Sequence, residues 1–147
     1  MRIVPATPAD HAAILRVWEA SVRVTHRFLA EDDIAFYKSL LAREALAAVD
    51  LYCVKDGQGR VLGFLGCAGS RIEMLFLEPD QRERGLGKQL VRHALERLGA
   101  RAVDVNEQNP AAIGFYTHMG FHVVGRSPRD GSGRPFPLLH MELRPPV

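Results

Sequence analysis

The feature that most constrains the fold is a segment with two glycines, residues 81–88, between an apolar run and an amphipathic run. The preceding run, residues 72–77, ends just before Pro79 and is typical of a buried strand. After the segment, apolar residues recur at helical spacing until Gly99: Leu86, Leu90, Val91, Ala94, Leu95 and Leu98. The chain is therefore predicted to pass from a strand to a helix through a glycine turn.

Such a turn predicts an anion site. The first backbone N–H groups of a helix have no partners within it, and the positive end of the helix dipole adds to their attraction for phosphate or pyrophosphate. Gly85 and Gly87 allow a ligand to approach the backbone closely, while Arg82, Arg84 and Lys88 add positive charge. The segment therefore predicts a phosphorylated cofactor.

Two common nucleotide motifs do not fit this segment. A P-loop would need glycine where Arg82 stands, and a Ser or Thr ligand for Mg²⁺ where Gln89 stands. A dinucleotide-binding turn would need a third small residue at Leu90. Both motifs are therefore excluded, because residues that each one requires are replaced in this chain.

Length and composition indicate one globular domain, residues 1–147, with its own core. A formal net charge of +2 and no basic-aromatic patch argue against nucleic acid as a partner. We expect no membrane association, since no apolar run has spanning length, and no secretory signal, since Met1 leads directly into a strand-like segment. Cys53 and Cys67 are typical of reduced core residues in a cytoplasmic protein, and the six histidines form no metal-binding ladder.

The order of elements predicts an α/β fold, a mixed sheet with helices packed on it. Strands are expected at residues 2–4, 51–55, 61–67, 72–77, 102–106, 122–126 and 136–143. Helices are expected after Thr7, with a break near residues 25–30, then around residues 34–41, 86–98 and 110–119.

Three blocks of sequence point to one family. They are Leu77-x-Pro79-x-x-Arg82-x-x-Gly85-x-Gly87, Val103-x-Val105-x-x-x-Asn109-x-x-Ala112-x-x-Phe115-Tyr116, and Met119-Gly120-Phe121. Together they resemble the GCN5-related N-acetyltransferase (GNAT) family, best over residues 51–121 and least in the first two helices. The resemblance implies a mixed, mostly antiparallel sheet of about seven strands with splayed parallel strands 4 and 5, flanked by about four helices.

The resemblance also implies a reaction: transfer of an acetyl group from acetyl-CoA to an amine by direct attack in a ternary complex. The pyrophosphate would bind the loop and helix start, and the pantetheine would lie along a strand and pair with its backbone. The implied cofactor-binding residues are Leu75, Leu77, Arg82, Glu83, Arg84, Gly85, Leu86, Gly87, Lys88, Asn109 and Ala112. Asn109 precedes Pro110, so it is also a good helix N-cap.

Tyr116 is the candidate general acid for the departing CoA thiolate, because a phenol can give a proton to a developing charge and is otherwise neutral. The alternative is an aromatic side chain that packs against Phe115 and Phe121.

Glu73 is the candidate base, acting directly or through water. Period-two alternation predicts that it shares a strand face with Leu75 and Leu77, opposite residues 72, 74 and 76. The alternative is a strand-entry charge paired with Arg71 or Arg101.

His26 and Phe28, at the break between the first two helices, and Asn106 are candidate acceptor-binding residues. Arg126, Arg129 and Arg134 could attract an acidic acceptor, although a solvated basic turn is the simpler interpretation. The acceptor itself, a small-molecule amine or a peptide or protein amine, is not specified by the sequence. A second hypothesis is a module that binds acyl-CoA without turning it over, and we expect a monomer or a homodimer.

Overall fold

The computed structural model describes residues 1–145, in which seven strands form one sheet in the order β1-β2-β3-β4-β5-β7-β6. Only β4 and β5 pair in parallel; all other neighbours are antiparallel. The strands are β1 (Arg2–Pro5), β2 (Asp50–Lys55), β3 (Val61–Ala68), β4 (Arg71–Leu77), β5 (Ala102–Asn106), β6 (Phe121–Ser127) and β7 (Leu138–Leu143).

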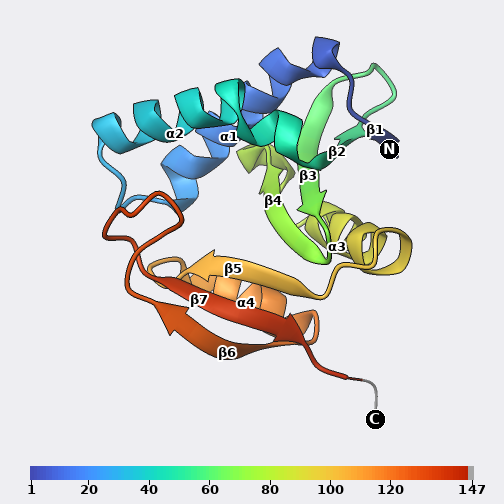
Figure 1. Cartoon of the computed structure of the whole chain (residues 1–147). Coiled ribbons are helices and arrows are strands. Elements are labelled where there is room, and N and C mark those ends of the chain that lie inside the picture. The colour runs from blue at the N-terminus through green and yellow to red at the C-terminus, as the bar shows by residue number, and fades with distance from the viewer. Residues whose placement is uncertain (146–147) are drawn as a thin grey trace.

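Helices cover both faces of this sheet (Figure 1). On one face lie α1 (His11–Thr25) and α2 (Glu31–Arg43), whose apolar stripes share a core with Phe64 and Met74 of β3 and β4. On the other face lie α3 (Leu86–Arg97) and α4 (Pro110–His118), which pack on a second core. The predicted α/β fold class is therefore confirmed, including the parallel pair of strands 4 and 5.

The parallel pair separates soon after it forms. Its paired positions are Arg71 with Ala102 and Ile72 with Val103, and no pairing follows within the described chain. Beyond Ile72 the backbone groups of β4 that face β5 are therefore free of sheet partners. A gap opens between the strands in the direction of their carboxyl ends, which is visible in Figure 1.

A β-bulge in β4 lies at the start of this gap. Gly66 of β3 pairs with Met74 and Cys67 pairs with Ile72, so Glu73 is an extra residue without a partner of its own. The extra residue shifts the alternation of side chains by one position. The prediction that Glu73 shares a face with Leu75 and Leu77, opposite Ile72, is therefore wrong. Ile72, Leu75 and Leu77 contribute to the core beneath α3 and α4, whereas Glu73 lines a cavity on the α1 and α2 face with Met74 and Phe76.

A hydrogen-bonded chain of side chains links the four strands around the gap. Ser127 of β6 contacts His140 Nε2 at 2.7 Å, and His140 Nδ1 contacts Asp104 of β5 at 2.7 Å. Arg71 of β4 donates to the same carboxylate at 2.8 Å. The chain connects β4 to β5 through side chains close to where their backbones cease to pair.

Most element boundaries lie within a residue or so of those predicted, and two of the larger differences have a local cause. The last strand begins at Leu138 rather than residue 136, because Pro135 and Pro137 lack the N–H groups that a sheet needs. Residues 8–10 form a 3₁₀ turn before α1, held by the Thr7 backbone N–H donating to Asp10 at 2.9 Å. Within residues 1–145, no helix is both long and apolar enough to span a membrane.

Candidate functional site

A cavity of about 460 Å³ opens where β4 leaves β5, and we call it the donor cavity. Its walls come from the end of α1, the second half of β4, the glycine segment and α4. The lining residues are Ser21, Thr25, His26, Leu75, Phe76, Leu77, Arg82, Glu83, Gly85, Gly87, Lys88, Asn109, Ala111, Ala112, Phe115 and Tyr116.

The glycine segment presents backbone rather than side chains to this cavity. Gly85 has a φ of 79° and caps α3, and Glu83 has a φ of 66°, so both occupy the left-handed region. Gly85 has no side chain that could satisfy the first amides of α3, which therefore remain available to an anion. Within this segment Arg82, Glu83 and Lys88 line the donor cavity.

Gly87 is required for a close contact on the first turn of α3. A Cβ placed there would lie 3.3 Å from Cζ of Phe115, which is tighter than side chains normally pack. Phe115 in turn stands edge-on to Tyr116, with 5.1 Å between the ring centres. The two helices α3 and α4 thus meet through a glycine on one side of the donor cavity.

Asn109 and Tyr116 enter the cavity from α4. Asn109 is the predicted N-cap, since its side-chain oxygen accepts the backbone N–H of Ala112 at 3.3 Å. Tyr116 is 6% exposed and packs edge-on against Phe121. Burial, with a smaller effect from nearby Cys67, raises the pKa of Tyr116 well above its usual value. The phenol therefore remains protonated at neutral pH.

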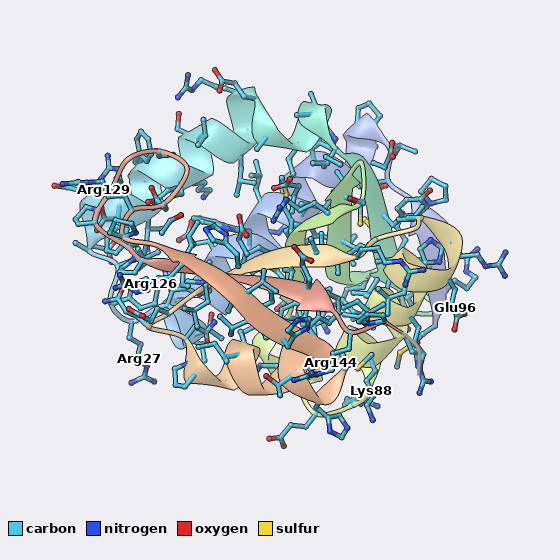
Figure 2. All side chains as sticks on the ribbon, turned by 60° about the horizontal axis from the view of Figure 1, so that its bottom comes forward. Arg27, Lys88, Glu96, Arg126, Arg129 and Arg144 are labelled. Carbon is cyan, nitrogen blue, oxygen red and sulfur yellow. The ribbon has the colours of Figure 1, made fainter. Side chains whose placement is uncertain are left out.

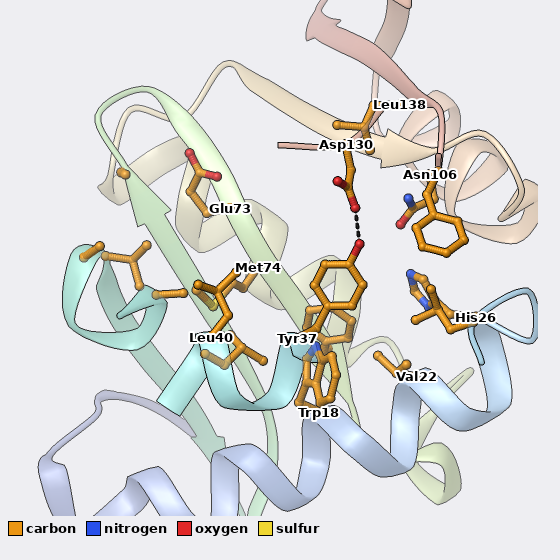
Figure 3. Close-up of a pocket in the computed structure, with 18 residues that line it drawn as sticks. Trp18, Val22, His26, Tyr37, Leu40, Glu73, Met74, Asn106, Asp130 and Leu138 are labelled. Atoms are coloured by element: carbon orange, nitrogen blue, oxygen red, sulfur yellow. Dashed lines mark hydrogen bonds between the residues drawn. The ribbon is translucent and has the colours of Figure 1, made fainter. Parts of the chain in front are cut away.

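A second cavity of about 430 Å³ lies beyond the first, on the α1 and α2 face, and we call it the acceptor cavity (Figure 3). Its polar lining consists of His26, Tyr37, Glu73, Asn106 and Asp130. The rest of the lining is apolar: Trp18, Val22, Leu29, Leu40, Leu41, Ala45, Ala48, Val49, Ala68, Met74, Phe76, Phe136 and Leu138.

The loop between β6 and β7 is fastened to α2 over this cavity. The Tyr37 hydroxyl donates to one carboxylate oxygen of Asp130, as the dashed line in Figure 3 shows. The other oxygen of Asp130 accepts the backbone N–H groups of Ser132 at 3.0 Å and Arg134 at 2.9 Å. Arg134 also donates to Asp33 at 2.7 Å. These contacts fix the position of Asp130 and of the loop that carries it.

Among the described residues, His26 and Phe76 line both cavities. His26 ends α1, where its backbone N–H donates to the Val22 carbonyl at 2.7 Å. Its ring lies 6.2 Å from the Phe76 ring, centre to centre. Burial lowers the pKa of His26, while the neighbouring Asn106 side chain has the opposite, smaller effect. The imidazole is therefore neutral at pH 7.

Most of the residues predicted from sequence gather at these two cavities. Lining the donor cavity are Leu75, Leu77, Arg82, Glu83, Gly85, Gly87, Lys88, Asn109, Ala112 and Tyr116. Glu73 and Asn106 line the acceptor cavity. Glu73 forms neither of the ion pairs considered for it within residues 1–145, and Arg71 binds Asp104 instead.

Three predicted residues do not line either cavity. Arg84 donates to the side chain of Gln81 at 3.2 Å. Leu86 is 1% exposed and packs in the core beneath α3. Phe28 packs between His26 and Phe136, with ring centres 5.3 and 5.6 Å away.

The arginines of the last hairpin have partners of their own. Arg126 forms a two-point ion pair with Glu107 at 2.7 and 3.0 Å, and Arg129 donates to the Gly133 carbonyl. Figure 2 shows Arg126 and Arg129 at the edge of the molecule, pointing outward. Neither lines the acceptor cavity, which favours the solvated-turn interpretation.

Sequence reasoning missed Phe76, Tyr37 and Asp130. Phe76 was expected to be an ordinary core residue, and no local pattern marks it as a boundary between cavities. Tyr37 and Asp130 are 93 residues apart in sequence, so only the folded chain brings them together.

Comparison with known proteins points in one direction. Residues 47–123 match the profile of a family described as an acetyltransferase (GNAT) domain. The peptidyl-lysine N-acetyltransferase YjaB of Salmonella typhimurium is 39% identical over 128 residues, covering 87% of this chain and 88% of that protein. The Escherichia coli protein of the same name is 37% identical, covering 87% and 86%. The solution structure of apo-form YjaB from E. coli superposes with a TM-score of 0.86 at 33% identity, over 96% of this chain and 95% of that one.

Proposed function

This chain belongs to the GNAT family of acetyltransferases, and from that premise we propose that it transfers an acetyl group from acetyl-CoA to a primary amine at the end of an apolar chain, such as a lysine side chain. The observation that carries the proposal is the meeting of two cavities at His26 and Phe76. One cavity suits a phosphorylated thioester, and the other suits an apolar amine.

The donor cavity fits acetyl-CoA on three features. The start of α3, capped by a left-handed Gly85, offers backbone N–H groups to a pyrophosphate. Arg82 and Lys88 add positive charge at the same place. The backbone of residues 75–77, free of pairing with β5, can hydrogen-bond the amides of the pantetheine as an added strand would.

The lining of the acceptor cavity favours an amine without a neighbouring carboxylate. Among the described residues that line it there is no Lys or Arg, so an amino-acid carboxylate would be buried there without a cation. Glu73 supplies negative charge for a cationic acceptor, and the apolar walls suit methylene groups. These properties match a lysine side chain, the acceptor named for the YjaB relatives.

The chemistry follows from the residues around the junction. Tyr116, kept protonated by burial, can donate to the CoA thiolate as the C–S bond breaks, and the same apolar cleft raises the basicity of that thiolate. Glu73 lines the acceptor cavity alone and can take, through water, the proton that a cationic amine must lose before it attacks.

Direct transfer is favoured over an acyl-cysteine intermediate. Cys53 and Cys67 are buried and free, and burial raises the pKa of each thiol to about 11. Such thiols are poor nucleophiles at neutral pH. Buried free cysteines also support a reducing compartment such as the cytoplasm.

The proposal is tested by measuring CoA release from acetyl-CoA across a panel of amines. The panel contains three kinds of amine: a lysine peptide, an alkylamine and free amino acids. Only the α-amine of the free amino acids has a carboxylate next to it. We expect turnover with the first two and little with the third. Tight acetyl-CoA binding without release of CoA under any condition would favour a non-catalytic acyl-CoA sensor.

A further inference from the structure

His26 occupies a position that no other polar side chain shares in the described chain. It lines both cavities, and the only other residue to do so, Phe76, has no group that can bind a proton. A reaction between a thioester in one cavity and an amine in the other must take place where the cavities meet. His26 is therefore the ionisable side chain at that place.

The hydrogen bonds of Thr25 define which ring nitrogen of His26 is free. The Thr25 hydroxyl has one hydrogen and donates it to the Ser21 carbonyl at 2.9 Å. The same oxygen lies 2.7 Å from His26 Nδ1, so it must accept from that nitrogen. Nδ1 then carries the proton of the neutral ring, and the lone pair is on Nε2. The side chain of Asn106 is a second hydrogen-bond partner of the ring.

Burial lowers the pKa of His26 and so keeps the ring unprotonated at neutral pH. Titratable and charged side chains from several elements line the two cavities that His26 borders. They are Tyr37 of α2, Glu73 of β4, Asp130 of the β6–β7 loop, Tyr116 of α4, and Arg82, Glu83 and Lys88 beside the donor cavity. No Lys or Arg lines the acceptor cavity in the described chain, so an imidazolium formed there meets no cation within that cavity.

Glu73 lies elsewhere in the acceptor cavity. In Figure 3 it stands at the opposite side of the cavity from His26 and Asn106, with Tyr37 and Asp130 between them. It does not line the donor cavity. Its place suits attraction of a cationic acceptor better than contact with the reacting nitrogen.

We propose that His26 is the catalytic base of the reaction, with Thr25 as the residue that positions its ring. The proposal rests on the proposed function. As the amine nitrogen bonds to the thioester carbon and the C–S bond breaks, one N–H proton passes to Nε2 of His26. The CoA thiolate takes a proton from the Tyr116 hydroxyl. Exchange with water then moves a proton from His26 to Tyr116, so amine and acetyl-CoA yield amide and CoA thiol.

The kinetic test compares His26→Gln, Glu73→Gln and a control, His118→Gln, which is exposed on α4 and lines neither cavity. For His26→Gln we expect kcat to fall roughly 100-fold and the acid limb of the pH–rate profile to disappear, with acetyl-CoA Kd within about twofold. Glu73→Gln should keep the acid limb and raise the KM of the amine. Added imidazole should restore turnover to His26→Ala but not to Glu73→Ala. An acid limb retained in His26→Gln would overturn the proposal.

A second measurement needs no turnover and separates this proposal from the proposed function. Nitrogen-15 NMR of the whole chain should show His26 neutral at pH 7 with the proton on Nδ1. Its signals should shift on addition of acetyl-CoA and, separately, of a lysine peptide. A proton on Nε2, or no response to either ligand, would reject His26 as the base even if the chain is an active acetyltransferase. If the His26 signals are as expected but no amine causes CoA release, the proposed function is rejected, whereas the tautomer and ligand contacts of His26 stand.

Discussion

The donor and acceptor cavities are built in different ways, although they share a wall. The donor cavity depends on the main chain: a glycine cap in the left-handed region, the first amides of α3, and strand backbone left unpaired where β4 leaves β5. The acceptor cavity depends on side chains from α1, α2, β4, β5 and the β6–β7 loop. Its closing contacts, Tyr37 with Asp130 and Arg134 with Asp33, join residues 93 and 101 positions apart.

This difference explains why members of one family can share a backbone ligand site and yet differ in a ligand site made of side chains. A backbone site requires glycine at one or two positions and tolerates many side chains elsewhere. A site made of side chains changes its ligand whenever a few residues change, without cost to the strand and helix framework. A ligand site made of backbone is thus set by the fold, whereas a ligand site made of side chains is set by the particular chain.

Among the changes that compare the two cavities, the largest effect is expected from Tyr116→Phe, which removes one hydroxyl from the donor side of the junction. We predict that kcat falls about 100-fold because the thiolate loses its acid, while the acetyl-CoA Kd changes less than about twofold. Steady-state kinetics and calorimetric titration measure the two quantities. Unchanged kcat would remove Tyr116 from the chemistry.

A comparison of two glycines tests the backbone character of the donor cavity. Gly85 and Gly59 both have positive φ, 79° and 80°, and a Cβ at either meets open space. Alanine at each should cost about 1 kcal/mol of folding stability through backbone strain. Only Gly85→Ala should weaken acetyl-CoA binding, by about tenfold, since it disturbs the first amides of α3. Equal affinities in both variants would show that the segment does not bind the donor.

A smaller effect, confined to the acceptor cavity, is expected from Tyr37→Phe. The change frees Asp130 from α2 and loosens the β6–β7 loop, so the amine KM should rise about threefold with acetyl-CoA affinity unchanged. Tyr52→Phe is the matched control, because Tyr52 packs against His93 and lines neither cavity. A parallel loss in both variants would point to general destabilisation instead.

The smallest effect concerns pH and stability. Burial lowers the pKa of His26 in the folded chain, so the unfolded chain binds more protons as the pH falls below about 6.5. Folding stability should therefore decline between the ordinary and the lowered pKa of this histidine, and less so in His26→Gln. Urea unfolding at a series of pH values measures this. His93, whose pKa burial also lowers, contributes the same background to both proteins.

The glycine turn and the helix starts beside the donor cavity could be predicted from sequence because their determinants are local. Gly85, Asn109 and the helices they begin were all visible as short patterns, and all three features appear where expected. The predicted alternation of side chains along β4 was wrong because the strand contains one extra residue. The bulge at Glu73 depends on pairing with β3, which alternation along β4 alone does not show.

The acceptor cavity could not be predicted from the sequence, for a different reason. Tyr37 and Asp130 meet only after the sheet has formed, and neither belongs to a recognisable motif. His26 was singled out by its place between two helices, but its contact with both cavities required the three-dimensional arrangement.

The most direct test of two cavities that meet at one reaction centre is binding of a bisubstrate conjugate, in which a two-carbon bridge joins the CoA sulfur to the lysine nitrogen of a peptide. Because it fills both cavities at once, it should compete with acetyl-CoA and with the amine, and bind at least about tenfold tighter than CoA. Competition with acetyl-CoA alone, at the affinity of CoA, would contradict the account.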